Sequence, residues 1–110
     1  MPRLATLSFL PVFSVLLVSA PACKRAEMAS EAECEHLLDR YIDLKLSEDA
    51  RARTMTSLDR AHLRAQIATE VLSDSDVKQV KTQCETEVTQ EEYKCAVAAP
   101  TSKAWNDCIQ

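Results

Sequence analysis

The chain has 110 residues, 13 Lys and Arg against 17 Asp and Glu, and a formal net charge of -4 at pH 7. This length allows one small domain, and the mildly acidic balance excludes a general nucleic-acid binder, because such a protein has a basic surface. The sequence contains no Gly, which excludes the glycine-rich phosphate loop, the dinucleotide fingerprint and the nucleophile elbow in their usual forms.

Residues 1–22 have the pattern of a secretory signal peptide. Arg3 is their only charged residue, and an apolar stretch over about residues 4–18 precedes small residues. A positive start, an apolar middle and a small-residue end are the parts of a cleavable export signal. The alternative is an uncleaved membrane anchor, since a span takes about 20 apolar residues, but Pro11 interrupts this stretch. We therefore expect a signal peptide over residues 1–22.

Cys23 directly follows the small-residue segment that ends the predicted signal. This junction is similar to a bacterial lipobox, in which the cysteine thiol is acylated and becomes the new N-terminus. It differs from the usual lipobox in having Ala20 where leucine is common, and Pro21 between Ala20 and Ala22. We expect lipidation at Cys23 and contact with a membrane through that lipid, with simple secretion as the alternative.

Residues 23–29 are expected to form the lipid attachment and a tether, and residues 30–110 a helical domain. Ser30 and Glu33 have the spacing of a capping box, which marks the start of a helix. Apolar residues then recur at steps of three and four, which predicts an amphipathic helix to about Leu46. These residues are Cys34, Leu37, Leu38, Tyr41 and Ile42.

The region from Glu48 to Leu72 contains no residue that forces a break in a helix. We expect it to divide at Thr56-Ser57, with Ser57 capping the second piece. Two adjacent apolar stripes predict burial over a broad face of this region. One stripe consists of Leu58, Ala61, Ala65, Ala68 and Leu72, and the other of Leu63, Ile67 and Val71.

Four arginines lie in the same region, namely Arg51, Arg53, Arg60 and Arg64. The favoured interpretation is a solvated helix face, in which Asp49 and Arg53 are in helical register. The alternative is a basic patch that meets anionic headgroups or an acidic partner.

The next helix is predicted to follow the turn-forming residues 73–76, which are Ser-Asp-Ser-Asp. Its apolar positions repeat with helical spacing and place Cys84 on the inward face. Thr89 and Glu92 then have the spacing of a second capping box, which predicts the start of a short helix.

Pro100 is predicted to end the short helix that carries Cys95, because the residue before a proline is pushed out of the helical region. A last helical segment with Trp105 and Cys108 should then fold back on it. Trp105 is interpreted as a core residue, with an anchor for a partner protein as the alternative.

The five cysteines are Cys23, Cys34, Cys84, Cys95 and Cys108. An odd number in an exported chain needs an explanation, and lipidation of Cys23 leaves four that can form two disulfides in an oxidising compartment. Four cysteines allow three connectivities, and the expected helix positions favour Cys34–Cys84 with Cys95–Cys108. A structural metal is disfavoured, because there is no C-x-x-C pair and only two histidines, His36 and His62.

No catalytic residue can be identified from the sequence. Neither histidine has an identifiable Ser or Cys nucleophile, and a cysteine hydrolase needs a free thiolate, which four paired cysteines do not leave. Four carboxylates could attract a cation but lack the spacing of a calcium loop. They are Glu85, Glu87, Glu91 and Glu92. We expect no enzymatic activity, no metal site and no cofactor.

The motifs follow one another in a recognisable order: Cys23, then C-E-H-L-L at residues 34–38, then Cys84, then E-Y-K-C-A-V-A-A-P-T-S-K-A-W-N-D-C at residues 92–108. This order resembles that of small four-cysteine lipoproteins of myxobacteria and related delta-proteobacteria. The resemblance covers about residues 34–46 and 77–108. It implies a helical fold and a location in the cell envelope, and it brings no catalytic residues with it.

The sequence therefore predicts an all-α domain of four or five helices, stapled by two disulfides and preceded by a signal segment. The expected function is that of a non-enzymatic lipoprotein of the bacterial cell envelope, tethered to a membrane through Cys23 and in contact with another envelope component. The first alternative is a soluble secreted binding protein, such as an inhibitor or a carrier of a small apolar ligand. A small hydrolase is the third.

Overall fold

The computed structural model describes residues 26–109, so the predicted signal peptide at residues 1–22 and the predicted lipidation site Cys23 lie outside the described residues. Within residues 26–109 the chain forms five α-helices and one 3₁₀-helix and contains no strand, as the all-α prediction requires. In chain order the elements are α1 (Glu31–Glu48), η1 (Ala50–Thr54), α2 (Ser57–Ser73), α3 (Ser75–Glu87), α4 (Gln90–Ala98) and α5 (Ser102–Ile109).

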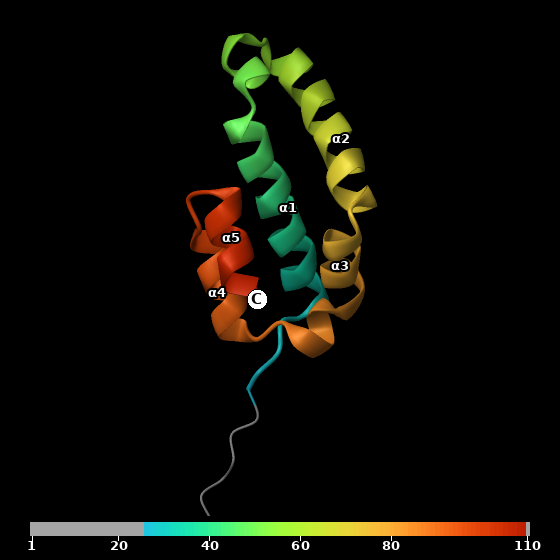
Figure 1. Cartoon of the computed structure of the whole chain (residues 1–110), viewed down its shortest axis with the longest axis vertical. Helices are drawn as coiled ribbons and strands as arrows, with labels where there is room; N and C mark the ends of the chain where they lie inside the picture. Colours follow the sequence, from blue (N-terminus) through green and yellow to red (C-terminus); the bar gives the residue numbers. More distant parts are fainter. Residues whose placement is uncertain (1–25, 110) are drawn as a thin grey trace, which may run out of the picture.

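Helix α1 is the element against which all the others pack (Figure 1). The chain turns at η1, returns along one side of α1 as α2 and α3, and then crosses to the other side, where α4 and α5 form a hairpin. The two sides of the bundle are therefore joined mainly through α1.

Both predicted capping boxes are present, and they start α1 and α4. The Ser30 hydroxyl accepts a hydrogen bond from the Glu33 amide at 3.2 Å, and the Thr89 hydroxyl accepts one from the Glu92 amide at 3.2 Å. In each box the glutamate carboxylate accepts a hydrogen bond from the backbone N–H of its capping residue. These contacts satisfy amide groups that have no partner inside the helix.

The middle of the chain differs from the prediction in two respects. Thr56 caps α2, whereas Ser57 was predicted to do so and is instead the first residue of that helix. The predicted burial of a broad face is also wrong, because only Leu63, Ile67 and Val71 of α2 are buried, whereas Leu58 is 66% exposed. The physical reason is that α2 packs mainly against α1 and α3, so one narrow face meets other residues of the described chain.

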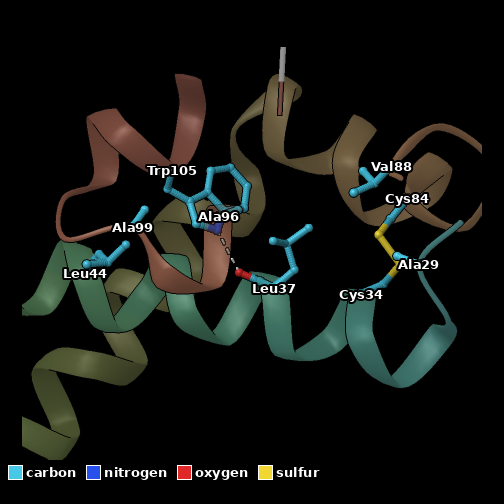
Figure 2. Packing of buried hydrophobic residues seen from close by; sticks show 9 residues of the cluster. All are labelled: Ala29, Cys34, Leu37, Leu44, Cys84, Val88, Ala96, Ala99 and Trp105. Atoms are coloured by element: carbon cyan, nitrogen blue, oxygen red, sulfur yellow. Dashed lines mark hydrogen bonds between the residues drawn. A yellow bond between two sulfur atoms is a disulfide. The ribbon is translucent and has the colours of Figure 1, made fainter. Parts of the chain in front are cut away.

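The core consists of two clusters that meet along α1. One lies between α1, α2 and α3 and contains Leu38, Ile42, Ala52, Leu63, Ile67, Val71 and Val77. The other lies around Trp105 and contains Ala29, Cys34, Leu37, Leu44, Cys84, Val88, Ala96 and Ala99 (Figure 2). Tyr41 and Val80 are partly buried and pack against both clusters.

Trp105 is a core residue, as predicted, with only 1% of its surface exposed. Its indole N–H donates a hydrogen bond to the Leu37 carbonyl oxygen at 3.1 Å (Figure 2), and its ring centroid lies 4.5 Å from that of Tyr41. A buried indole needs such a polar partner, and this one fixes α5 against the middle of α1.

Both disulfides have the predicted connectivity. Cys34–Cys84 joins the first turns of α1 to the last turn of α3, and its two cysteines are buried in the cluster around Trp105. Cys95–Cys108 joins α4 to α5 and closes the hairpin, with Cys95 exposed to solvent. The first disulfide therefore cross-links the core, and the second cross-links a hairpin at the surface.

The end of the predicted tether is part of the fold. Met28 and Thr89 form an isolated β-bridge, in which the Ala29 N–H donates to the Val88 carbonyl oxygen at 2.9 Å and the Gln90 N–H donates to the Glu27 carbonyl oxygen at 2.8 Å. Ala29 is also buried in the core. The predicted tether at residues 23–29 is therefore shorter than expected, because its last three residues are fixed to the domain.

The bend between α1 and η1 gives the first testable prediction. Three hydrogen bonds from Arg51, two from its side chain and one from its backbone N–H, lower the pKa of Asp49 from 3.8 to about 2. Because the folded state favours the ionised carboxylate, its stabilising effect is present above about pH 4 and is lost as the pH falls toward 2. Asp49→Asn, which keeps a good capping residue, should lower the melting temperature slightly at pH 7 and leave it unchanged near pH 2.

The control for this prediction is Glu85→Gln, which removes one exposed carboxylate from α3. If Asp49→Asn lowers the melting temperature by the same amount at pH 7 and at pH 2, the charge of Asp49 is not the cause.

Candidate functional site

The main concave feature of the described chain is an open groove of about 1260 Å³. Helices α2 and α3 form one wall, α5 forms the opposite wall, and α1 lies at the base. Tyr41, Val80 and Ile109, which come from α1, α3 and α5, are partly buried apolar residues of the lining that pack against the cluster containing Trp105, and they are called the floor below. The groove lies along the line where the two core clusters meet.

The groove is strongly acidic. Its lining includes seven carboxylates, which are Glu48, Asp49, Glu70, Asp74, Asp76, Glu87 and Glu92. The only lysine or arginine in the lining is Lys45. The formal charge of the lining is therefore -6.

Several of these carboxylates also have structural roles. Glu48 accepts hydrogen bonds from the backbone N–H and the hydroxyl of Ser102 at 2.6 and 2.7 Å, which lower its pKa and hold the start of α5 against the end of α1. Asp74 caps α3 and Glu92 completes a capping box. Asp49 is paired with Arg51 at 2.7 Å. The hydrogen bonds to Glu48 and Asp49 favour the ionised form of these two carboxylates. Asp and Glu side chains are ordinarily ionised at pH 7, so the groove is negatively charged at neutral pH.

The four arginines of the middle region do not form one free basic patch. Asp49 was predicted to be in helical register with Arg53, but its partner in the structure is Arg51. Arg64 lies 2.8 Å from Asp43 and 3.6 Å from Asp39. Arg60 donates a hydrogen bond to the Ala52 carbonyl oxygen at 2.8 Å. Arg60 thus joins α2 to η1, Arg64 joins α2 to α1, and Arg51 is paired locally at the bend between α1 and η1.

The remaining candidates from the sequence are separated by the fold. His36 is exposed, and its Nδ1 lies 2.8 Å from the Tyr93 hydroxyl, while His62 is exposed on α2. Of the four C-terminal carboxylates, Glu87 and Glu92 line the groove, and Glu85 lines a smaller depression between α1 and α3. Among residues 26–109, no group of three His, Cys, Asp or Glu side chains is placed to hold a metal ion.

Sequence reasoning missed the groove. Its walls come from helices that are far apart in the chain, so no local spacing reveals it. A partial signal was the cluster of glutamates at the end of α3, which the structure divides between two surfaces.

The helices of the described part of the chain are also too short or too polar to cross a membrane. The fold and the groove define a small all-α domain stapled by two disulfides, with an acidic open groove on one face. No family model, curated protein or solved structure shows a significant match to the chain.

Proposed function

We propose that the chain is an exported lipoprotein of the bacterial cell envelope that is tethered through acylated Cys23 and acts by binding another envelope component. The observation that supports this most is the combination of a signal-like N-terminus ending at Cys23 with four further cysteines that all pair within the domain. Cys23 is thereby the one cysteine without a partner in either disulfide, as a lipid-attachment site requires. The groove offers the domain a surface through which to bind.

The docked N-terminal segment adds a geometric argument to this proposal. Glu27 is fixed to Gln90 by a backbone hydrogen bond, and four residue steps separate it from Cys23. A chain of this length spans at most about 14 Å. A lipid on Cys23 would therefore hold the domain next to the membrane surface.

Intact mass of the protein isolated from native membranes tests the proposal. We expect a chain that begins at Cys23 and carries acyl groups, with four cysteines that can be alkylated only after reduction. Cys23→Ser should abolish labelling with palmitate completely and move the protein from the detergent phase to the aqueous phase. The double variant Cys95→Ser with Cys108→Ser is the control, because it also replaces cysteines but should keep the label.

Two other masses would contradict the tether. A chain that begins at Cys23 without acyl groups would indicate the soluble secreted binding protein. A chain that retains residues 1–22 would indicate an uncleaved membrane anchor.

A further inference from the structure

The acidity of the protein is concentrated in the groove. Residues 26–109 contain 17 Asp and Glu and 10 Lys and Arg, a formal charge of -7, and the groove lining accounts for -6 of it. The rest of the described chain has ten carboxylates and nine Lys and Arg, and is nearly neutral. Such an asymmetry creates a local field that attracts cations to one face of the molecule.

The carboxylates are spread along the groove and do not converge on one point. Asp76 and Glu87 stand at opposite ends of α3, and the eleven residue steps from one to the other correspond to about 16 Å along a helix. Metal–oxygen bonds are only about 2.0–2.6 Å long, so one ion could not bridge such a distance. A chain segment that carries several cationic side chains could, since about five extended residues span 16 Å.

The floor adds a second requirement for the occupant. Tyr41, Val80 and Ile109, one each from α1, α3 and α5, are partly exposed in the lining of the groove. Apolar surface of this kind is stabilised when it is covered by another apolar group. The groove thus fits a ligand that places cationic groups against the carboxylates and an apolar side chain against the floor.

We propose that the groove binds a basic peptide segment of an envelope partner, with an apolar side chain of that segment on the Tyr41–Val80–Ile109 floor. This inference rests on the proposed function, in which the domain acts through contacts with another envelope component, and it names the chemistry of that component. The occupant is chosen by charge complementarity. Its lysine and arginine side chains lie against the carboxylates of α2 and α3. Two of these carboxylates, Glu70 and Glu87, are exposed.

The test uses the mature lipidated protein in a non-ionic detergent and a fluorescein-labelled peptide of 14 lysines and leucines, with the leucines at steps of three and four. Binding is measured by fluorescence anisotropy at about 0.1 M salt. The variant Glu70→Gln with Glu87→Gln should bind this peptide about three- to tenfold more weakly, because each charge contributes modestly at an exposed site. This difference should disappear near 1 M salt, where charges are screened within about 3 Å.

The matched control is Glu35→Gln with Glu85→Gln, which removes the same charge from the depression between α1 and α3. It should bind the peptide within about twofold of the unaltered protein, because a lost surface charge outside the groove is screened beyond about 10 Å. Equal weakening by both double variants would overturn the inference, since attraction to the whole surface would then explain binding.

Three further results would also overturn it. The first is no binding of the peptide, or equal binding of a peptide with glutamate in place of lysine. The second is displacement by spermine at the same concentration, which would indicate a site for small polycations. The third is tighter binding after Lys24→Gln with Arg25→Gln, which would make the chain's own basic pair the occupant. Palmitate labelling of Cys23 does not depend on peptide binding. The labelling experiment can therefore contradict the proposed lipidation, and the peptide experiment the proposed groove ligand, independently of each other.

Discussion

Replacing Cys34 and Cys84 together with alanine is expected to lower the free energy of unfolding by about 4 kcal/mol. The bond closes a loop of 50 residues, and a cross-link stabilises a fold mainly by reducing the conformational entropy of the unfolded chain, by about 4 kcal/mol for a loop of this length. Both cysteines are also buried in the core, so the substitution removes packing as well. Urea unfolding followed by circular dichroism, without reductant, measures the loss.

The second disulfide is the matched comparison. Cys95–Cys108 closes a loop of 13 residues, for which the same relation gives about 3 kcal/mol. Because Cys95 is exposed, replacing this pair with alanine adds little loss of packing. If replacing Cys95 and Cys108 lowers the free energy of unfolding more than replacing Cys34 and Cys84 does, neither loop length nor burial determines which disulfide is the more stabilising.

Trp105→Ala is expected to destabilise the fold by about 3–5 kcal/mol, as truncation of a large buried aromatic side chain does. Trp105 is 1% exposed, packs against Tyr41 and joins α5 to α1 through its hydrogen bond to the Leu37 carbonyl oxygen. Since small domains have total stabilities of about 5–15 kcal/mol, a large share of the molecules should then be unfolded at 37 °C. Urea unfolding followed by far-ultraviolet circular dichroism measures this effect without the tryptophan signal.

Two substitutions separate the causes of this loss. Trp105→Phe keeps an aromatic ring but removes the hydrogen bond to the Leu37 carbonyl oxygen, which is worth about 1 kcal/mol. Leu58→Ala truncates a large apolar side chain that is 66% exposed and should cost no more than about 0.5 kcal/mol. Similar losses for Trp105→Ala and Leu58→Ala would contradict the assignment of Trp105 to the core.

Features set by local chemistry could be predicted from the sequence. The capping boxes at Ser30 and Thr89 depend on residues three positions apart, and both are present. The disulfide pairing followed from the number of cysteines and from helical spacing, which places Cys34 and Cys84 on inward faces.

Features set by contacts between distant helices could not be predicted in this way. The two apolar stripes of α2 look alike in the sequence, yet only the one with Leu63, Ile67 and Val71 is buried, because burial depends on which side of α2 meets α1. The groove is a stronger case, since its carboxylates come from α1, α2, α3, α4 and the turns beside them and share one surface only in the folded chain.

The position of the disulfides has a consequence for how the domain responds to mechanical load. A pull on the N-terminus first reaches the hydrogen bonds between Ala29 and Val88 and between Glu27 and Gln90. Beyond these hydrogen bonds the force passes through the disulfide from Cys34 to Cys84. The 50-residue loop that this disulfide closes contains most of α1, all of α2 and most of α3, and it carries none of the force. A pull between the two ends of the chain likewise bypasses the 13-residue stretch between Cys95 and Cys108. Stretching can therefore peel the N-terminal segment away and lengthen the link at residues 84–95, while the helices inside both loops stay unloaded.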